Sequence, residues 1–331
     1  MAASHVLALH ARLPDRYAHL ELLASTIDAR GRLLALLADP AQPVPPASTS
    51  PPSGANYDAT VAICDAGDIT EIPLRHLDLR FTALDALGTG VVLAAARIPR
   101  ACPDEWTRRG PVPADGLNLT HNVRLFDASG KPTGSFYAGD AIDQMITDPD
   151  GRIWISYFDE ARFWAPDANG TRSLQLPVGL ARWDTWDAAP WLAARHTSGV
   201  FWLDCYALNV GRARVRACPY PNFPLVELES RGFLSTTATS VEYCHGMAVS
   251  GDGFAFFRPH VGRSDPIGWE IVRARREGGA IVEVDREELL LPDGRRPTGW
   301  PIGKVGRDSG LWLRELASPR EWYRFDLGGS C

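Results

Sequence analysis

The sequence predicts an all-β chain folded as a six-bladed β-propeller, with its ring closed by the N-terminal strand. Three observations support this expectation. A unit made of an apolar run, a tight turn with Gly or Asp and a second apolar run recurs six times, about 42 to 61 residues apart. A second hairpin follows most of these units, and a spare alternating strand precedes the first. Strand repeats of this length are typical of propellers.

The six repeated units are expected to be the inner hairpins of six blades. In each unit the two apolar runs alternate like strands, and the turn between them carries Gly, Asp or Asn. The inner hairpins are Leu22–Leu37, Phe81–Ala95, Ile142–Tyr157, Asp204–Cys218, Cys244–Phe257 and Trp300–Leu313.

A second hairpin completes each of the first five blades, which gives four strands, A to D, from the centre outwards. These outer hairpins are Tyr57–Cys64 with Ile69–Leu74, Val123–Phe126 with Thr133–Tyr137, Leu180–Trp183 with Trp191–Ala194, Leu225–Leu228 with Gly232–Ser235, and Trp269–Arg275 with Ala280–Val284.

The last unit is too short to form a blade alone. After Leu311–Leu316 only Glu321–Leu327 remains, which is enough for one strand. We expect the spare strand His5–Arg12 to pair beside it, because this removes exposed strand edges and closes the ring. A seven-bladed ring is the alternative, but no seventh turn supports it.

Composition sets further limits. The chain has 331 residues, of which 45% are hydrophobic, and fits one domain over residues 1–331. A net charge of −6 gives no basic surface, so no nucleic-acid partner is expected. No apolar run is long enough for a membrane span, and no signal peptide or lipid motif is recognisable. Six cysteines without CxxC spacing indicate free thiols and a cytoplasmic location.

Long loops are predicted on one face of the disc. Two Pro-rich or irregular segments, at about 38–56 and 97–122, separate strand B from strand C in their blades. Shorter B–C loops follow at 159–179 and 258–268. Antiparallel order puts all B–C loops on the face where the A strands begin, so we expect a functional pocket there. The first of these segments is expected to bury little surface.

Aligning the six A strands by their turns predicts a site at the channel mouth. The aligned starts are Leu23, Thr82, Asp143, Asp204, His245 and Pro301. Asp143, Asp204 and His245 are therefore the candidate catalytic residues, for general acid–base chemistry. With Glu242 they are also candidate metal ligands, and a divalent cation, Ca²⁺ or Zn²⁺, is one expectation. An ordinary hydrated channel lining is the alternative, and a slip of one residue in the fourth blade would remove Asp204.

Other residues near the strand starts are expected to line a substrate pocket. They are Glu21, Arg80, Asp140, Asp159 and Trp300. If both carboxylates face His245, we expect the pKa of its imidazole to rise. A Cys205–His245 nucleophile pair is a weaker alternative. Because no GxSxG, HExxH, phosphate-loop or dinucleotide motif is present, no nucleotide or redox cofactor is expected.

Several segments resemble known propeller families. Gly139–Gln144, Asp150–Glu160, Asp204–Val210 and Asn222–Val226 are similar to uncharacterised bacterial six-bladed propeller proteins. More distantly, the Asp150–Trp154 turn resembles NHL-repeat proteins and the gluconolactonase and strictosidine-synthase propellers. The hydrolytic relatives use Glu, Asn and Asp ligands for a divalent cation. Asp143, Asp204 and His245 depart from that set, so calcium-dependent lactonase activity is not implied.

The sequence thus leads to two function hypotheses. The first is an enzyme that hydrolyses, isomerises or cyclises a small metabolite in a pocket on the loop face. The second is a non-enzymatic scaffold that holds a protein or peptide on that face. A closed pocket with Asp143, Asp204 and His245 favours the enzyme, whereas a broad flat rim favours the scaffold. The oligomeric state is left open.

Overall fold

The computed structural model describes residues 3–46, 56–97, 120–159, 179–229, 232–260 and 268–328. These residues are almost entirely β-strands. The described helices are a 3-10 turn at Asp15–Tyr17 and the four-residue helix α1 (Ala193–His196). No described helix is long and apolar enough to cross a membrane.

Three groups of four consecutive strands form separate antiparallel sheets. The first contains β3 (Glu21–Ile27), β4 (Leu33–Ala38), β5 (Tyr57–Asp65) and β6 (Asp68–Leu77). The second contains β7 (Ala83–Leu87), β8 (Gly90–Ala94), β9 (Val123–Phe126) and β10 (Pro132–Phe136). The third contains β11 (Ile142–Thr147), β12 (Ile153–Tyr157), β13 (Leu180–Trp183) and β14 (Trp191–Leu192).

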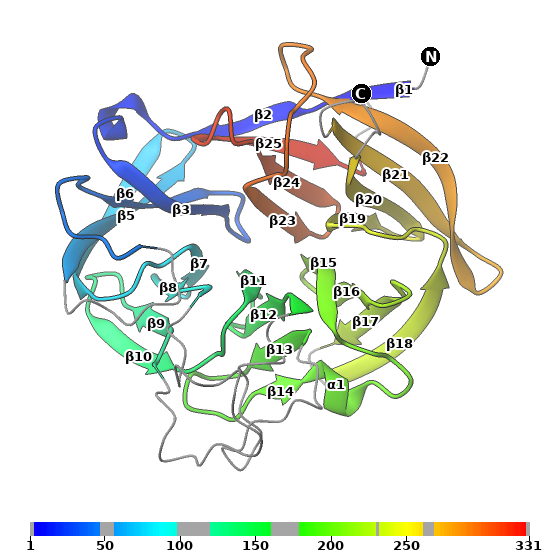
Figure 1. The fold of residues 1–331 in the computed structure, drawn as a ribbon, viewed down its shortest axis with the longest axis horizontal. Helices are drawn as coiled ribbons and strands as arrows, with labels where there is room; N and C mark the ends of the chain where they lie inside the picture. The colour runs from blue at the N-terminus through cyan, green and yellow to red at the C-terminus, as the bar shows by residue number, and fades with distance from the viewer. Residues whose placement is uncertain are drawn as a thin grey trace, which may run out of the picture.

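The remaining strands repeat this order. They are β15 (Asp204–Val210), β16 (Val215–Tyr220), β17 (Leu225–Glu229) and β18 (Gly232–Thr239), then β19 (Gly246–Ser250), β20 (Gly253–His260), β21 (Gly268–Glu277) and β22 (Ala280–Leu290), then β23 (Gly303–Arg307), β24 (Gly310–Arg314) and β25 (Glu321–Asp326). Short parallel contacts, such as Asn209 with Gly306, link these groups. Figure 1 shows the sheets arranged around a common centre, with β3, β7, β11, β15, β19 and β23 innermost. The fold is a β-propeller.

The N-terminal strand lies beside the last strand of the chain. β2 (Ala8–Arg12) pairs antiparallel with β25, from Ala8 with Arg324 to Arg12 with Glu321. The expected single strand over His5–Arg12 is divided, because β1 (Ala3–Val6) pairs in parallel with β22 instead. Leu7, between them, is 1% exposed and donates its amide to the Leu290 carbonyl. The N-terminus therefore contacts two sheets (Figure 1).

Aspartate side chains explain why the same turn recurs. Oδ1 of Asp148 accepts the amide N–H groups of Asp150 and Arg152, both at 3.0 Å, and Oδ2 accepts Nε1 of Trp154 at 3.0 Å. Asp28 and Asp127 accept amides two and four residues later in the same way. An Asp that bonds its own turn fixes the reversal between two strands.

The hydrophobic core lies between neighbouring sheets. Leu34 and Leu36 of β4, for example, pack in one buried cluster with Leu84 of β7 and with Val91 and Leu93 of β8. This cluster joins two consecutive sheets, so the packing that stabilises one sheet also fixes its angle to the next.

Two predicted details differ in the structure. Ala193 and Ala194 begin α1 rather than end a strand, so β14 stops at Leu192. The start of the first long loop is also better packed than expected. The Gln42 side chain donates to the Asp58 carbonyl at 3.1 Å and accepts its amide at 2.6 Å, and Pro45 is buried. The rest of the long-loop predictions, over 47–55, 98–119, 160–178 and 261–267, lies outside the described residues.

Candidate functional site

The register of the inner hairpins defines which residues share a depth in the channel. In each of the six hairpins one pair joins residues five or six positions apart across the turn, such as Val210 with Val215 and Thr147 with Ile153. The residue four positions before the first member of this pair lies at the same depth in each inner strand. These residues are Leu23, Thr82, Asp143, Tyr206, His245 and Ile302.

This register corrects the sequence alignment in two strands. Tyr206, not Asp204, is the equivalent of Asp143, and Ile302 replaces Pro301. The cause in β15 is the position of its turn: the strand continues through Asn209 and Val210, so its equivalent position lies two residues later than an alignment by turn residues gives. The register shift between Cys205 and Ala207 matches the shift at Asp143 in β11 and supports the new alignment.

A cavity of about 280 Å³ lies among the inner strands. Most of its walls are residues of β3, β7, β11 and β23, together with the segment before β23. The lining residues are Ser25, Thr26, Thr82, Ala83, Leu84, Asp143, Gln144, Met145, Ile146, His245, Trp300, Pro301, Ile302, Gly303, Lys304, Val305, Arg314 and Trp322. Asp143, His245 and Trp300 were predicted for this site, and the structure brings all three to the same cavity.

Lys304 is the residue that sequence reasoning missed. Its Nζ lies 2.9 Å from Oδ2 of Asp143 and 3.4 Å from the Tyr206 carbonyl oxygen. Lys304 comes from β23 and Asp143 from β11, which lie on opposite sides of the centre in Figure 1. The ammonium thus reaches across the channel and neutralises the carboxylate. A lysine inside an inner strand that is otherwise apolar or Gly is the signal that could have found it.

His245 is held between aromatic rings at the same end of the channel. Its ring centroid is 4.8 Å from Tyr206 and 5.1 Å from Trp300. Burial, and then the charge of Lys304, lower the pKa of His245 to about 3, although Asp143 opposes this. The expectation of a raised pKa was therefore wrong, because the nearby carboxylate comes with a lysine and an apolar cage. The imidazole is neutral near pH 7.

Asp204 lies beside the cavity rather than in its wall. Burial raises the pKa of this carboxyl to about 7, the charges of Asp143 and Asp159 add to the rise, and Lys304 opposes it. Asp204 therefore shares its electrostatic surroundings with Asp143 and Lys304. A carboxyl that titrates near neutral pH can both donate and accept a proton.

The other predicted pocket residues are placed differently. Glu21 and Arg80 form an ion pair of 2.7 Å with each other, and neither is in the cavity wall. Asp140 is 2% exposed and lies 3.6 Å from Nε of Arg97. Asp159 is exposed and acts on the site only through its charge.

The predicted metal ligands do not form a cluster in the described part of the chain. No three His, Cys, Asp or Glu side chains there are grouped so that they could hold a metal ion. Glu242 is exposed, and Lys304 places a positive charge on Asp143, which disfavours a divalent cation. The site thus fits a metal poorly, and the cation stays a prediction from the sequence.

Cys205 is not placed as a nucleophile. Its side chain is fully buried, its Sγ lies 3.6 Å from the Ala207 carbonyl oxygen, and burial raises the pKa of the thiol well above its usual value. A protonated, buried thiol is inert.

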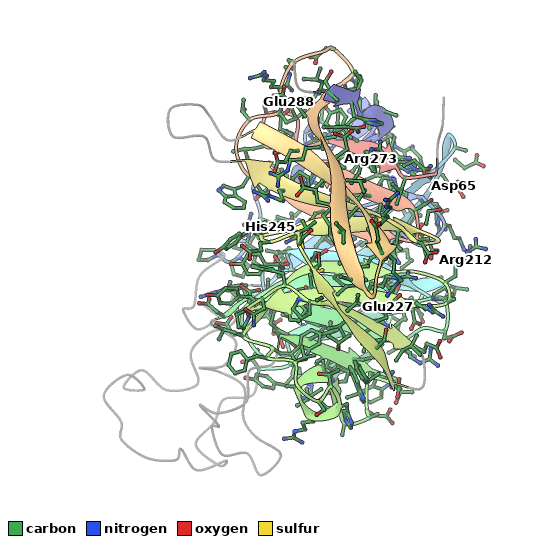
Figure 2. The ribbon with its side chains drawn as sticks, turned by 90° about the vertical axis from the view of Figure 1, so that its right-hand side faces the viewer. Asp65, Arg212, Glu227, His245, Arg273 and Glu288 are labelled. Carbon is green, nitrogen blue, oxygen red and sulfur yellow. The ribbon has the colours of Figure 1, made fainter. Side chains whose placement is uncertain are left out.

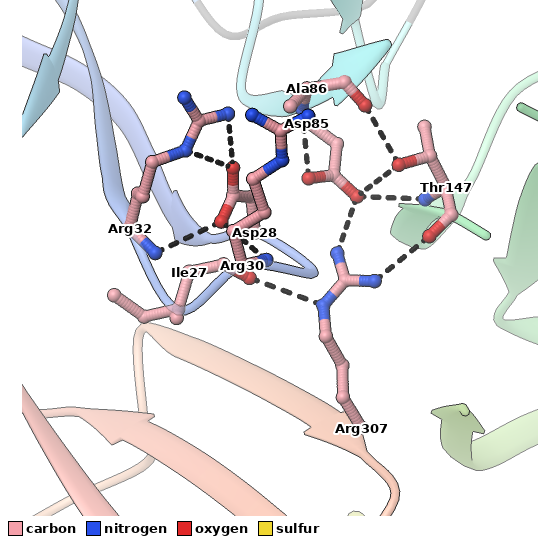
Figure 3. Close-up of polar contacts among 8 residues, drawn as sticks. All are labelled: Ile27, Asp28, Arg30, Arg32, Asp85, Ala86, Thr147 and Arg307. Carbon is pink, nitrogen blue, oxygen red and sulfur yellow. Dashed lines mark hydrogen bonds and ion pairs between the residues drawn. The ribbon is translucent and has the colours of Figure 1, made fainter. Parts of the chain in front are cut away.

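A buried polar network crosses the channel below the cavity (Figure 3). The guanidinium of Arg307 in β23 bonds Oδ2 of Asp85 in β7 at 2.6 Å, the Thr147 carbonyl in β11 at 2.8 Å and the Ile27 carbonyl in β3 at 3.3 Å. Oδ2 of Asp85 also accepts the Thr147 amide at 2.7 Å. Asp85 and Arg307 are 0% and 7% exposed. Every inner strand that the network joins is therefore fixed at its C-terminal end.

The network lies next to the lining of the cavity. Thr26, Leu84 and Ile146 line the cavity, and each directly precedes a member of the network. Asp143 lies four residues before Thr147, which corresponds to about 13 Å along an extended strand. Figure 2 shows His245 toward one face of the molecule, and Asp65 and Arg212, from tight turns, toward the other.

Comparisons with known proteins give distant similarities and leave the activity open. No family model matches the chain, and no curated protein matches it. Among solved structures, it is similar to a streptogramin B lyase, with 10% identity, 96% of both chains covered and a TM-score of 0.46. It is similar to a putative gluconolactonase, with 12% identity, 97% and 98% covered and a TM-score of 0.42. It is also similar to a gluconolactonase of Xanthomonas campestris, with 8% identity, 98% of both covered and a TM-score of 0.40.

The distant likeness to gluconolactonase-type propellers that the sequence suggested is thus confirmed. Because identity and TM-scores are this low, we infer no activity from it, and the functional argument rests on the residues of this chain.

Proposed function

We propose that the protein is an enzyme that transforms a small molecule by general acid–base catalysis in this cavity. The observation that carries the proposal is the Asp143–Lys304 pair of 2.9 Å in the wall of a cavity of about 280 Å³. Such a pair is of little use to a structural channel lining, because desolvating two charges costs free energy that a hydrophobic pair would not. It gives a reacting molecule a base and a cation side by side.

The charges suggest a role for each group. Asp143 would accept a proton from the substrate, and Lys304 would stabilise negative charge that develops on a carbonyl oxygen. His245 is neutral near pH 7 and can donate or accept a hydrogen bond without adding charge. Asp204, with a pKa of about 7, would exchange the proton with solvent at the rim. Hydrolysis, isomerisation and cyclisation of a carbonyl compound all need these steps.

We also infer a closed ring of six blades. Each inner strand is followed by three further strands of its sheet, except β23, which has only β24 and β25. β2 supplies the fourth strand there through its pairing with β25. This supports the closure predicted from His5–Arg12. The buried free thiols of Cys205, Cys218 and Cys244 fit the predicted reducing, cytoplasmic location.

A screen for turnover of lactones, aryl esters and enolisable ketones tests the proposal. We expect Asp143→Asn and Lys304→Met to lower kcat/KM of any substrate found by about 100-fold or more, as loss of a proton-transfer group does. Glu21→Gln is the control, since Glu21 is outside the cavity. Full activity in both cavity variants would contradict the proposal. A chelator should leave activity unchanged, whereas a metal-dependent loss would support the predicted cation.

A non-enzymatic scaffold is the second candidate. It is favoured by the exposed aromatic rings at the rim, since Trp300 is 50% exposed and Tyr243 54% exposed. A peptide-binding protein would lose its partner in Trp300→Ala and Tyr243→Ala, and would keep it in Asp143→Asn.

A further inference from the structure

Arg314 is a cation in the cavity wall that has no carboxylate partner. It is the last residue of β24 and lies opposite Gly303 in the β23–β24 pair. Its guanidinium donates to the carbonyl oxygens of Pro319 and Ile302, both at 3.1 Å, and it forms no ion pair with any described residue. Nε is buried and has no hydrogen-bond partner. Of five N–H groups, three are therefore left without an acceptor among the described residues.

The surrounding packing holds this guanidinium in place. It lies over the ring of Trp322, with Cζ 5.4 Å from the ring centroid, and Nε1 of Trp322 donates to Ser25 at 3.0 Å. A Cβ at Gly303 would be 3.0 Å from Nε of Arg314 and 2.7 Å from Trp322. Arg314 is thus packed closely against an indole and a glycine backbone, which favours the fork geometry that binds oxyanions.

Nearby acids do not neutralise Arg314, because they have other partners. Glu315 accepts Arg295 at 2.6 Å, and Glu321 accepts Arg12 at 2.5 Å. Asp143, the acid in the same cavity wall, is paired with Lys304. Burial lowers the pKa of Arg314 to about 10, as expected for a cation without a counter-charge. The guanidinium therefore remains available to an anion that enters the cavity.

We propose that the cavity takes an organic anion, whose carboxylate or phosphate group binds Arg314 while its apolar body lies against Met145, Leu84 and Val305. This inference names the substrate class of the proposed enzyme and therefore rests on the proposed function. The volume of about 280 Å³ fits a small molecule, because it lies at the lower end of known ligand pockets. The groups of the cavity wall then have separate tasks: Arg314 anchors the anion, and Asp143 with Lys304 faces the reacting group.

Benzoate and benzamide are suitable probes, because they share one ring and differ in charge. Binding is followed through the indole N–H signal of Trp322, assigned with Trp322→Phe, in the full-length protein at low salt. We expect benzoate to bind at least about tenfold more tightly than benzamide. Inorganic phosphate, added as a competitor, should displace benzoate if the site binds oxyanions in general, and should not if it needs a carboxylate on a ring.

Variants identify the cation that is responsible. Arg314→Met should abolish the preference for benzoate, Arg314→Lys should retain part of it, and Arg75→Met, at an exposed ion pair outside the cavity, should leave it unchanged. Melting curves of each variant show that the fold is kept. Equal binding of benzoate and benzamide to the unmodified protein would overturn the proposal, as would loss of the preference in Lys304→Met but not in Arg314→Met.

The outcomes separate this inference from the proposed function. If Asp143→Asn keeps the preference for benzoate and no turnover is found, the anion site stands and the enzyme proposal fails. If turnover of neutral substrates is found with no preference for anions, the enzyme proposal stands and the anion site fails.

Discussion

Nζ of Lys304 and Oδ2 of Asp143 meet at 2.9 Å across the channel, from strands on opposite sides of the centre. This contact decides the electrostatics of the whole site. Lys304 contributes to the lowered pKa of His245 and opposes the raised pKa of Asp204. One ammonium therefore sets the protonation of two neighbours, and removing it should change both.

We predict that His245 does not titrate between pH 5 and 8, because burial and Lys304 hold its pKa at about 3. An NMR titration of its ring signals, assigned with His245→Gln, would show flat chemical shifts over this range. In Lys304→Met the pKa should rise by about one unit, since the repelling charge is gone and Asp143 remains. A titration midpoint near 6.5 in the unmodified protein would show that the imidazole is not caged as described.

The stability of the protein should fall as the pH rises from about 4 to above 7. Asp204 has a folded-state pKa of about 7, above its unfolded value, so the folded state binds this proton more tightly. The contribution of the protonated Asp204 to the free energy of unfolding is fully present below pH 4 and is lost as the pH rises through 7. Asp204→Asn should remove this dependence and stabilise the protein at pH 8 by about 1–2 kcal/mol, discounted for partial exposure. Urea unfolding at pH 5 and pH 8 measures the effect, and an unchanged pH slope in the variant would contradict it.

Breaking the network below the cavity should destabilise the fold strongly. Asp85→Asn leaves the buried Arg307 without a counter-charge, so we expect a loss of about 3–5 kcal/mol in the free energy of unfolding. Arg75→Met at the exposed Asp58 pair is the matched control and should cost less than about 1 kcal/mol. The double variant Asp85→Leu with Arg307→Met should recover part of the loss. Equal, small effects at both sites would mean that solvent reaches the network.

Deleting residues 1–12 should lower the melting temperature and the soluble yield sharply. The deletion removes β1 and β2, exposes the edges of β25 and β22, and takes the buried Leu7 out of its cluster. Replacing only residues 1–4, which leaves β2 intact, is the milder control. A truncated protein that melts at the original temperature would show that β2 adds nothing to the last sheet.

Most strands could be predicted because the turns carry their own signal. An Asp that bonds the amides two and four residues later, as Asp148 does, is visible in the sequence and fixes the hairpin around it. The division of the N-terminal strand at Leu7 could not be predicted, because His5–Arg12 has one pattern throughout, and only the positions of β22 and β25 decide the partner of each half.

The candidate site was predicted only where the end of the inner strand could be recognised from the turn residues. Asp143 and His245 were found because the turns that follow them are marked by Asp and Gly. Tyr206 was missed because Asn209 and Val210 resemble turn residues, whereas β15 continues through both of them. Arg314 and the Asp85–Arg307 pair were overlooked as lone charges in apolar strands. Asp85 and Arg307 lie 222 residues apart in the chain, and only the folded structure brings them within bonding distance.

The Arg307 network also has a consequence for how the chain is made. Arg307 bonds Ile27 and Asp85, which precede it by 280 and 222 residues. During synthesis from the N-terminus, the first three sheets emerge long before this guanidinium. Asp85 must therefore stay hydrated, and the inner strands of these sheets lack the hydrogen bonds that Arg307 later forms. Contacts this distant in sequence slow folding and link the first sheets to the last. A nascent chain that stops before residue 307 should therefore be open to proteases across its whole inner rim, and completion of the final sheet should end that exposure in one step.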